Sequence, residues 1–371
     1  MVWRVLVGLA GGALIVLMLG EFFVAFLLPR RVKRDPRIAR GLFRMLWRPW
    51  RWVASRLSSA AEDTMLGFFG PLALVIELVI WTLGLMIGFA ALEWSFGSRL
   101  GPGASHGFGD DIYFSSGQFL SAAVTAVPVG SAARALSLAE AATGVGVLFT
   151  IIGYLPSVYG AFSRREIAVS QLAPRAGSPP TAFRLITRTA ETGRWQDLRD
   201  YLKEAEAWAA ELMETHLSYP QLAYYRSQHV NQNWLAALTT IVDASAAVLA
   251  AVPEGEAISA ENTYAIGRHA FSDLAHQFRA RRDHTPRRLS DEGFDLLRNA
   301  FESENKRLVD RETMRRRLDR FRSEYEPNAL GLSEWLGLPL PEWVATDVLQ
   351  REGRPRVEAT PPSPTVRTPG R

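Results

Sequence analysis

Three long apolar runs occupy the first half of the chain, and polar sequence with helical spacing follows them. The runs extend over residues 5–28, 66–92 and 135–162. Each exceeds the roughly 20 residues that a helix needs to cross about 30 Å of hydrocarbon. The pattern predicts three transmembrane helices. The first run is also longer than the apolar part of a signal peptide, about 7–15 residues, so we expect this helix to be retained.

A shorter apolar and aromatic segment, residues 113–130, lies between the second and third runs. It is too short to cross a bilayer, and it ends in Thr, Pro and Gly. Non-helical backbone at membrane depth is tolerated only where protein buries it or where it lines a water-filled cavity. The segment therefore predicts a re-entrant pore loop. The predicted filter region consists of Gln118, Ser121, Ala122, Ala123, Val124, Thr125 and Ala126.

Basic residues are concentrated between the first two apolar runs, where Asp35 is the only acid before Glu62. Cytoplasmic loops carry such an excess of Lys and Arg. The pattern predicts an N-terminus outside the membrane and a cytoplasmic C-terminal domain. The basic residues are Arg30, Arg31, Lys33, Arg34, Arg37, Arg40, Arg44, Arg48, Arg51 and Arg56.

Apolar residues interleave with these arginines at helical spacing. This pattern predicts an amphipathic helix that lies on the anionic cytoplasmic leaflet, with anionic lipid as its partner. A basic loop that only sets the topology is compatible with the same pattern, and we do not expect nucleic acid to bind so close to lipid. The apolar residues are Leu42, Phe43, Leu46, Trp47, Trp50 and Val53.

The polar half of the chain predicts a helical bundle with few strand signals. Its expected helices cover 182–192, 195–217, 219–252, 257–281, 290–325 and 341–349. The expected organisation is an N-terminal transmembrane helix (1–28), a basic amphipathic segment (29–62), a pore-loop module (63–165), a linker (166–181), a cytoplasmic helical domain (182–350) and a disordered tail (351–371). The fold class is therefore an all-α membrane protein.

Several short sequence motifs resemble those of a known family. They are Trp47-Arg-Pro-Trp50, Glu140-Ala-Ala-Thr-Gly144, Ile152-Gly-Tyr-Leu-Pro156, Ala161-Phe-Ser-Arg-Arg-Glu166, Ala176-Gly-Ser-Pro-Pro180, His216-Leu-Ser-Tyr-Pro220, Leu222-Ala-Tyr-Tyr-Arg-Ser-Gln-His229 and Asn231-Gln-Asn-Trp-Leu-Ala-Ala-Leu238.

Through these motifs, the chain resembles a bacterial two-transmembrane potassium-channel-like family that has an extra N-terminal helix and a helical cytoplasmic domain. The resemblance implies a pore module of outer helix, re-entrant pore helix and inner helix. It also implies a homotetramer in the bacterial inner membrane that conducts a monovalent cation. A non-conducting scaffold or regulatory subunit that keeps the pore fold is the alternative.

The filter departs from the family pattern, which is Thr-x-Gly-Tyr/Phe-Gly-Asp. If Ser121 is aligned with the filter Thr, Ala123 and Thr125 stand where Gly is expected. A register that starts at Thr125 puts Val127 and Val129 at these positions, and neither register keeps the terminal Asp. A stack of inward-pointing carbonyls needs backbone conformations that glycine reaches most easily. We therefore expect altered or lost potassium selectivity.

Further candidates lie inside the apolar runs. The candidates for a gating hinge in the inner helix are Gly144, Gly146, Gly153 and Pro156, with close helix packing as the alternative. In the second run, Gly84 and Gly88 are expected to serve helix packing. Glu21, Glu77 and Glu140 are intramembrane acids, which are expensive in lipid and hence functional candidates.

The remaining chemistry is sparse. The chain has no Cys, which excludes disulfides and thiol catalysis. Tyr219, Tyr224, Tyr225 and the polar residues that follow them suggest either a ligand pocket or a hydrogen-bonded interior. His269, Asp273 and His276 share a helix face but have no fourth ligand nearby. No enzyme activity, metal or cofactor is expected.

Overall fold

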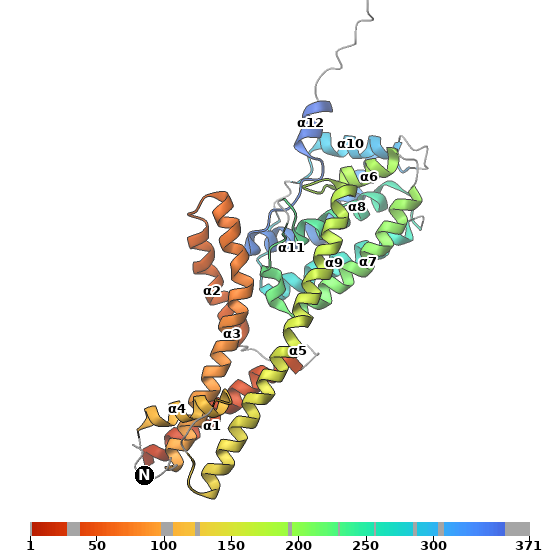
Figure 1. Cartoon of the computed structure of the whole chain (residues 1–371). Coiled ribbons are helices and arrows are strands. Elements are labelled where there is room, and N and C mark those ends of the chain that lie inside the picture. The colour runs from red at the N-terminus through yellow and green to blue at the C-terminus, as the bar shows by residue number, and fades with distance from the viewer. Residues whose placement is uncertain are drawn as a thin grey trace, which may run out of the picture. The chain divides into compact units, whose positions relative to one another are not determined.

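The computed structural model describes residues 2–27, 38–97, 107–122, 127–191, 195–228, 231–255, 257–284, 288–302 and 308–352. Every element within these ranges is a helix (Figure 1), so the all-α prediction is confirmed. The chain forms two compact units. Unit 1 comprises Met1–Ala168 and Glu211–Gln228, and unit 2 comprises Val169–Ala210 and His229–Arg371.

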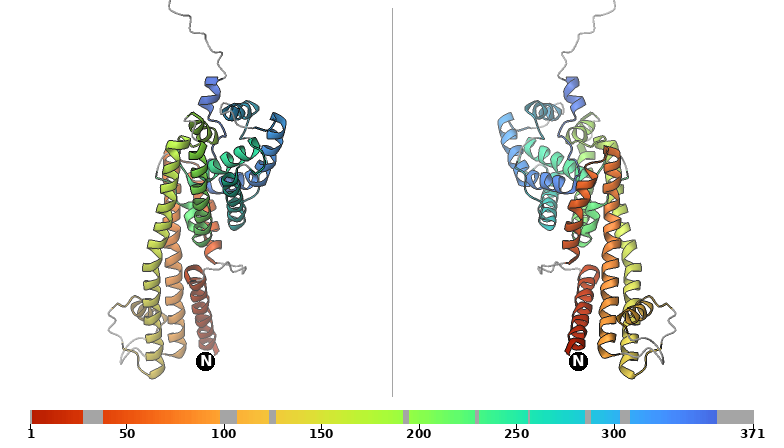
Figure 2. Two further views of the ribbon diagram at one scale, coloured as in Figure 1. Left: turned by 90° about the vertical axis from the view of Figure 1, so that its right-hand side faces the viewer. Right: turned by 90° about the vertical axis from the view of Figure 1, so that its left-hand side faces the viewer.

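Unit 1 contains the apolar helices of the first half of the chain. Helix α3 (Ser59–Phe96) is its central element, and both α1 and α4 pack on it (Figure 2). The other elements are α1 (Val2–Phe22), the π-helical turn η1 (Phe23–Leu27), α2 (Ile38–Ala54), α4 (Phe108–Phe119), the 3-10 turn η2 (Pro220–Tyr224) and the first part of α5 (Ser131–Ala176).

Small residues let α1 and α3 approach closely. A Cβ on Gly11 would lie 2.7 Å from the carbonyl oxygen of Gly88, and a Cβ on Gly84 would lie 2.7 Å from the sulfur of Met18. Close approach through small residues is the usual way for helices to pack in lipid, where burial of apolar surface gives little driving force. The prediction that Gly84 and Gly88 serve packing is therefore confirmed.

Among the described residues, four helices are long and apolar enough to cross a membrane: α1 with η1, α3, α5 and α8 (Trp234–Ala251). The first three contain the predicted apolar runs. Helix α8 differs, because almost its whole surface is enclosed by other helices of unit 2. A helix that is apolar on all sides and surrounded by protein is typical of a globular core.

Unit 2 is a bundle around α8. It contains the first part of α7 (Trp195–Ser218) together with α6 (Ala182–Glu191), α9 (Ile258–Phe278), α10 (Asp291–Glu302), α11 (Arg311–Leu336) and α12 (Thr346–Glu352). The helices expected over 219–252 and 290–325 are each divided in two. Helix α5 also continues to Ala176, so much of the segment expected to be a linker is helical.

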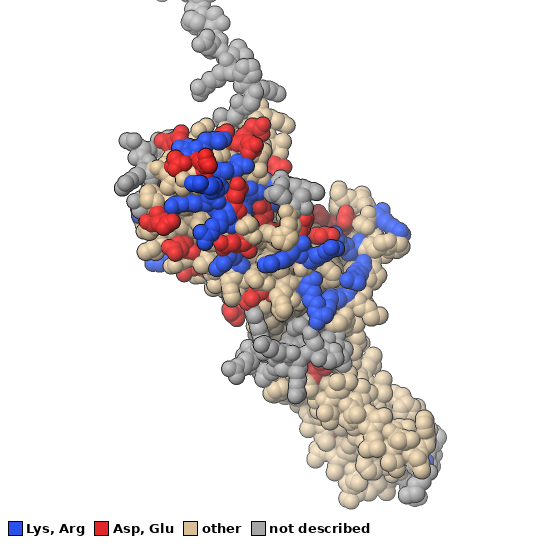
Figure 3. All heavy atoms as spheres, turned by 180° about the vertical axis from the view of Figure 1, so that it is seen from behind, with Lys and Arg blue, Asp and Glu red and all other residues tan. Residues whose placement is uncertain are grey.

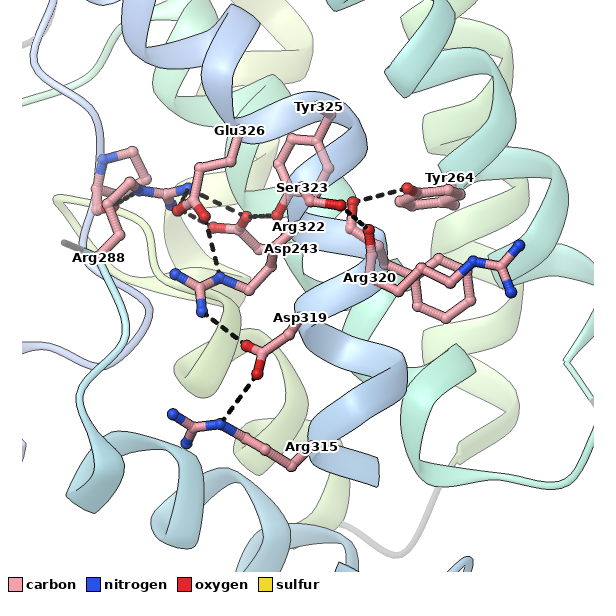
Figure 4. Close-up of polar contacts among 12 residues, drawn as sticks. Asp243, Tyr264, Arg288, Arg315, Asp319, Arg320, Arg322, Ser323, Tyr325 and Glu326 are labelled. Atoms are coloured by element: carbon pink, nitrogen blue, oxygen red, sulfur yellow. Dashed lines mark hydrogen bonds and ion pairs between the residues drawn. The ribbon is translucent and has the colours of Figure 1, made fainter. Parts of the chain in front are cut away.

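A buried ionic network joins α8 to α11 (Figure 4). Asp243 is fully buried and forms an ion pair with Arg288, and it accepts a hydrogen bond from the hydroxyl of Tyr325. Arg288 also contacts Glu326 at 3.2 Å, and Glu326 accepts from Nε of Arg322 at 3.0 Å. Burial alone would lower the pKa of Arg288, but the charges of Asp243 and Glu326 raise it above its ordinary value. Two acids and two arginines therefore balance each other inside the bundle.

Candidate functional site: a short helix and the open face of α5

Helix α4 covers residues 108–119 and so overlaps the first part of the predicted pore loop, and defined signals begin and end it. At its start, the backbone N–H of Gly107 donates to Oδ2 of Asp110 at 3.1 Å, and acids in the first turn favour the positive end of the helix dipole. At its end, the N–H groups of Ser121 and Ala122 donate back to carbonyls of the last turn at 3.1 and 2.8 Å. This is a Schellman cap. With 12 residues the helix is about 18 Å long, too short to cross a bilayer.

The cap uses part of the predicted filter. Gln118 lies in α4, and Ser121 takes the left-handed backbone conformation (φ 53°) that a Schellman cap requires and that glycine adopts most easily. Residues 123–126 lie outside the described residues, so the conformation of the filter stays a prediction.

Ser115 connects α4 to both neighbouring helices. Its hydroxyl lies 2.8 Å from the carbonyl oxygen of Met86 on α3 and forms a second hydrogen bond with Oε1 of Glu140 on α5. Ser115 and Glu140 are fully buried. The predicted intramembrane acid Glu140 is therefore placed directly behind α4 and helps to hold it.

Sequence reasoning missed a second buried acid in this place, Glu93, because it lies just beyond the predicted end of the second apolar run. Glu93 is fully buried, and neither of its carboxyl oxygens has a hydrogen-bond partner among the described residues. It interacts electrostatically with Asp111 and with Glu140. Burial of a carboxyl group between apolar helices costs free energy. These three acids, together with Ser115, form an acidic cluster against α4.

The other two predicted acids form a separate pair. Glu77 on α3 is buried, with 7% of its surface exposed, and it interacts electrostatically with the half-buried Glu21. They do not join the cluster at α4.

Gly144 is where α4 and α5 meet. A Cβ at this position would lie 2.1 Å from the carbonyl oxygen of Phe119, the last residue of α4. Only glycine permits this approach, so packing explains Gly144. The other hinge candidates differ, since Gly146 and Gly153 have nothing within 4 Å of an added Cβ and Pro156 lies within the continuous helix α5.

These two open glycines belong to a stripe of small residues along α5. The stripe consists of Ala139, Thr143, Gly146, Thr150, Gly153, Ser157 and Gly160. None of them is buried in unit 1. Their spacing alternates between four and three residues, as in a helix seam. The stripe is about 32 Å long, close to the thickness of the hydrocarbon core.

The two sides of the stripe differ in character. On one side lies the face of α5 that packs inside unit 1, with Glu140, Gly144 and Val147. On the other side lie large exposed apolar residues, including Phe149 (68% exposed), Ile152 (58%) and Tyr159 (68%). The hydroxyls within the stripe donate to carbonyls four residues earlier, at 2.7 to 3.1 Å, so they are satisfied within the helix.

A strap, which we define as residues 219–227, contacts α2 and α3. The ring of Tyr224 lies 4.9 Å from that of Trp47 and 5.1 Å from that of Phe69. Trp47 and Phe43 are buried by this packing, although the sequence pattern assigned them to a membrane-facing stripe. The apolar side of α2 that carries them therefore faces protein.

The strap also contacts α5. Tyr219 packs on Tyr154 with ring centroids 5.3 Å apart, and the hydroxyl of Tyr154 accepts a hydrogen bond from Gln221. Tyr225 packs on Phe162 at 5.6 Å. Segments far apart in the sequence therefore meet at the strap. They are the segments around Trp47, Tyr154, Arg165, His216 and Tyr224.

Arg165 holds the strap to the part of α5 that follows its apolar run. Its guanidinium donates to the carbonyl oxygens of Leu222 (2.8 Å) and Tyr225 (3.0 Å), to Oε1 of Glu166 through two nitrogens (3.0 and 2.9 Å), and to Nε2 of His216 (3.4 Å). Arg165 is buried, and these contacts use all five of its N–H donors. A lysine has only three donors and could not replace it.

His216 completes this contact. Its Nδ1 donates to the carbonyl oxygen of Leu212 at 2.8 Å, which leaves Nε2 as an acceptor for Arg165. Burial, and then the charge of Arg165, lower the pKa of His216 to about 3.

The polar and aromatic residues that suggested a ligand pocket divide between the two units. Tyr219, Tyr224 and Tyr225 belong to the strap. Asn233 lies in unit 2, where its side chain accepts from the N–H of Ala236 and caps α8. His229 lies outside the described residues. Tyr219, Tyr224, Tyr225 and Asn233 thus make structural contacts.

The predicted helix face with His269 and Asp273 does not gather a set of metal ligands. His269 pairs with Asp273 at 3.4 Å, and within the described ranges no group of three or more His, Cys, Asp or Glu residues could hold a metal ion.

Comparison with protein-family models, curated proteins and solved structures gave no match.

The contact at Gly144 predicts a position-specific effect of alanine. Gly144→Ala should destabilise the protein by about 1–3 kcal/mol, because the new methyl group displaces the end of α4. Gly20→Ala, on α1 with nothing within 4 Å, is the control and should be neutral or stabilising by about 0.5–1 kcal/mol. Thermal unfolding in detergent measures both. Equal midpoints for the two variants would contradict the packing described here.

His216 predicts a pH dependence of stability. The unfolded chain binds a proton at this residue below about pH 6.5, whereas the folded protein does not until about pH 3. Folding stability should therefore fall by about 1.4 kcal/mol per unit as the pH decreases below 6.5.

The measurement is the difference in unfolding free energy between the parent and His216→Gln at pH 5.5 and 7.5. His269→Gln is the control, because its ring is 61% exposed. The stability advantage of the parent over His216→Gln should shrink at pH 5.5, and a pH-independent difference would refute the assignment.

Proposed function

We propose that the protein is the subunit of a homo-oligomeric, potassium-channel-like cation pore in a bacterial inner membrane. In this proposal α3 is the outer helix, α4 the re-entrant pore helix and α5 the inner helix. The observation that carries it is α4: a helix too short to span, held between two long apolar helices by Ser115 and Gly144. The N-terminus lies outside and unit 2 is cytoplasmic, as the basic loop predicts.

Several copies are needed, because one re-entrant loop cannot enclose a pore. Pores of this type are rings of identical segments around an axis. The small-residue stripe on α5 supports such a ring, since it is open in one chain and spans about the thickness of the hydrocarbon. The family resemblance makes four the expected number.

The acidic cluster supports cations as the permeant class. Glu93, Asp111 and Glu140 place negative charge, or groups able to carry it, behind α4 in a medium of low dielectric constant. Acids in such positions mark ion pathways in membrane proteins. The absence of glycine in the filter sequence supports weak discrimination between potassium and sodium.

The strap supports a route by which the helical domain acts on the pore. The chain enters the strap from α7 and leaves it toward α8, and Arg165 ties the strap to α5 just after the apolar run of that helix. In this proposal a displacement of the strap moves this part of α5 and hence changes the pore.

A non-conducting scaffold is the second candidate. The sequence favours it, because neither alignment of the predicted filter has glycine at the positions where the family pattern expects it. In this reading the oligomer forms, but no ion passes.

Currents through the purified protein in planar bilayers test the proposal. Under opposed potassium and sodium gradients, the parent should carry cation current with a reversal potential near zero. Replacement of residues 121–126 by Thr-Leu-Gly-Tyr-Gly-Asp should shift the reversal potential toward that of potassium, because glycine restores the backbone freedom that a filter needs. Strong potassium selectivity of the parent would refute the glycine argument. Silence of both proteins as intact oligomers would favour the scaffold.

A further inference from the structure

Helix α2 has two apolar faces, of which the fold uses one. Phe43 and Trp47 point inward and are buried, with 7% and 1% of their surfaces exposed. On another face Met45 is 74% exposed and Trp52 is 56% exposed. These two residues are seven positions apart, so they lie on one side of the helix. The fold of unit 1 gives no reason for large apolar residues on this side.

Basic side chains lie beside this second apolar face. Arg44, Arg48, Arg51 and Arg56 all lie in or next to α2, and the sequence has no acid from residue 36 to residue 61. The guanidinium of Arg56 stacks on the ring of Trp52 at 3.3 Å. Figure 3 shows Lys and Arg side chains gathered on the lobe that α2 and the start of α3 form.

The packing of α2 on α3 places this face at a particular height along α3. The indole N–H of Trp50 donates to the carbonyl oxygen of Met65 at 2.9 Å, and Trp47 packs on Phe69 with ring centroids 4.7 Å apart. The apolar run of α3 begins at residue 66. The middle of α2 is therefore level with the point where α3 would enter the hydrocarbon, and lipid head groups lie at that height.

We propose that the outward face of α2, defined by Met45, Arg48, Trp52 and Arg56, binds the head groups of anionic phospholipids. The arginines pair with the phosphates, while Met45 and Trp52 enter the interface between head groups and acyl chains, where amphipathic aromatic rings are most favourable. This differs from the sequence-based expectation, which also assigned Phe43 and Trp47 to the membrane. The proposal requires α3 to cross a membrane but is independent of ion conduction.

A site-specific probe can test this, because the chain has no native Cys. A fluorophore is attached to Met45→Cys in the full-length protein, which is reconstituted in phosphatidylcholine nanodiscs. Increasing fractions of phosphatidylglycerol with a nitroxide head group are then added. Quenching should saturate at a lower fraction for this lipid than for phosphatidylcholine with the same nitroxide.

Two arginine variants make the test specific. Arg48→Gln with Arg56→Gln should weaken the apparent affinity for phosphatidylglycerol about 25-fold, since each arginine near a membrane surface contributes about fivefold. Arg268→Gln with Arg320→Gln is the matched control; these residues are 48% and 80% exposed in unit 2. The control should leave the affinity unchanged.

Two results would overturn the proposal. Equal quenching by both lipids would show that charge does not direct the contact, and a probe that neither lipid quenches would show that this face meets water or protein instead. Neither result depends on whether the protein carries current, so the failure of this proposal is distinct from a failure of the pore.

Discussion

A helix too short to cross a bilayer would have its ends at membrane depth, where non-helical backbone must be covered by protein or line a water-filled cavity. The packing of unit 1 around α4 depends on this constraint. Helix α4 meets it in two ways. Ser115 hydrogen-bonds toward both α3 and α5, and Gly144 allows α5 to touch the last carbonyl of α4. Once α4 is fixed, the packed face of α5 is fixed as well. The small-residue stripe is then left on the outside of unit 1.

The strap is the second fixed point of α5. A buried arginine with all five donors satisfied is a rigid contact, and it joins three segments of unit 1 that are distant in sequence. Helix α5 is thus held by α4 near one end and by the strap near Arg165. The residues between these points, around Gly153 and Pro156, make few contacts on the stripe side. This arrangement is compatible with a helix that moves as a lever between two attachments.

Sequence reasoning succeeded where the signal is local. The three apolar runs lie in helices, because length and hydrophobicity decide such elements, and the short segment between the second and third runs contains the last part of α4. It could not identify contacts between residues that are distant in sequence. Gly144 contacts Phe119, and Arg165 binds carbonyl groups 57 and 60 residues away. Glu93 was overlooked because it follows the end of the run. The break before α8 was missed although Asn233 is a good N-cap residue.

Cross-linking of single cysteines in native membranes tests the central claim, that copies of the chain pack through the small-residue stripe of α5. Thr150→Cys preserves the size of the side chain at the middle of the stripe. Val16→Cys, on α1 and 72% exposed, is the control for random encounters. We expect a short bifunctional maleimide to join copies through position 150 and not through position 16. Cross-linking at position 16 with none at position 150 would contradict the account.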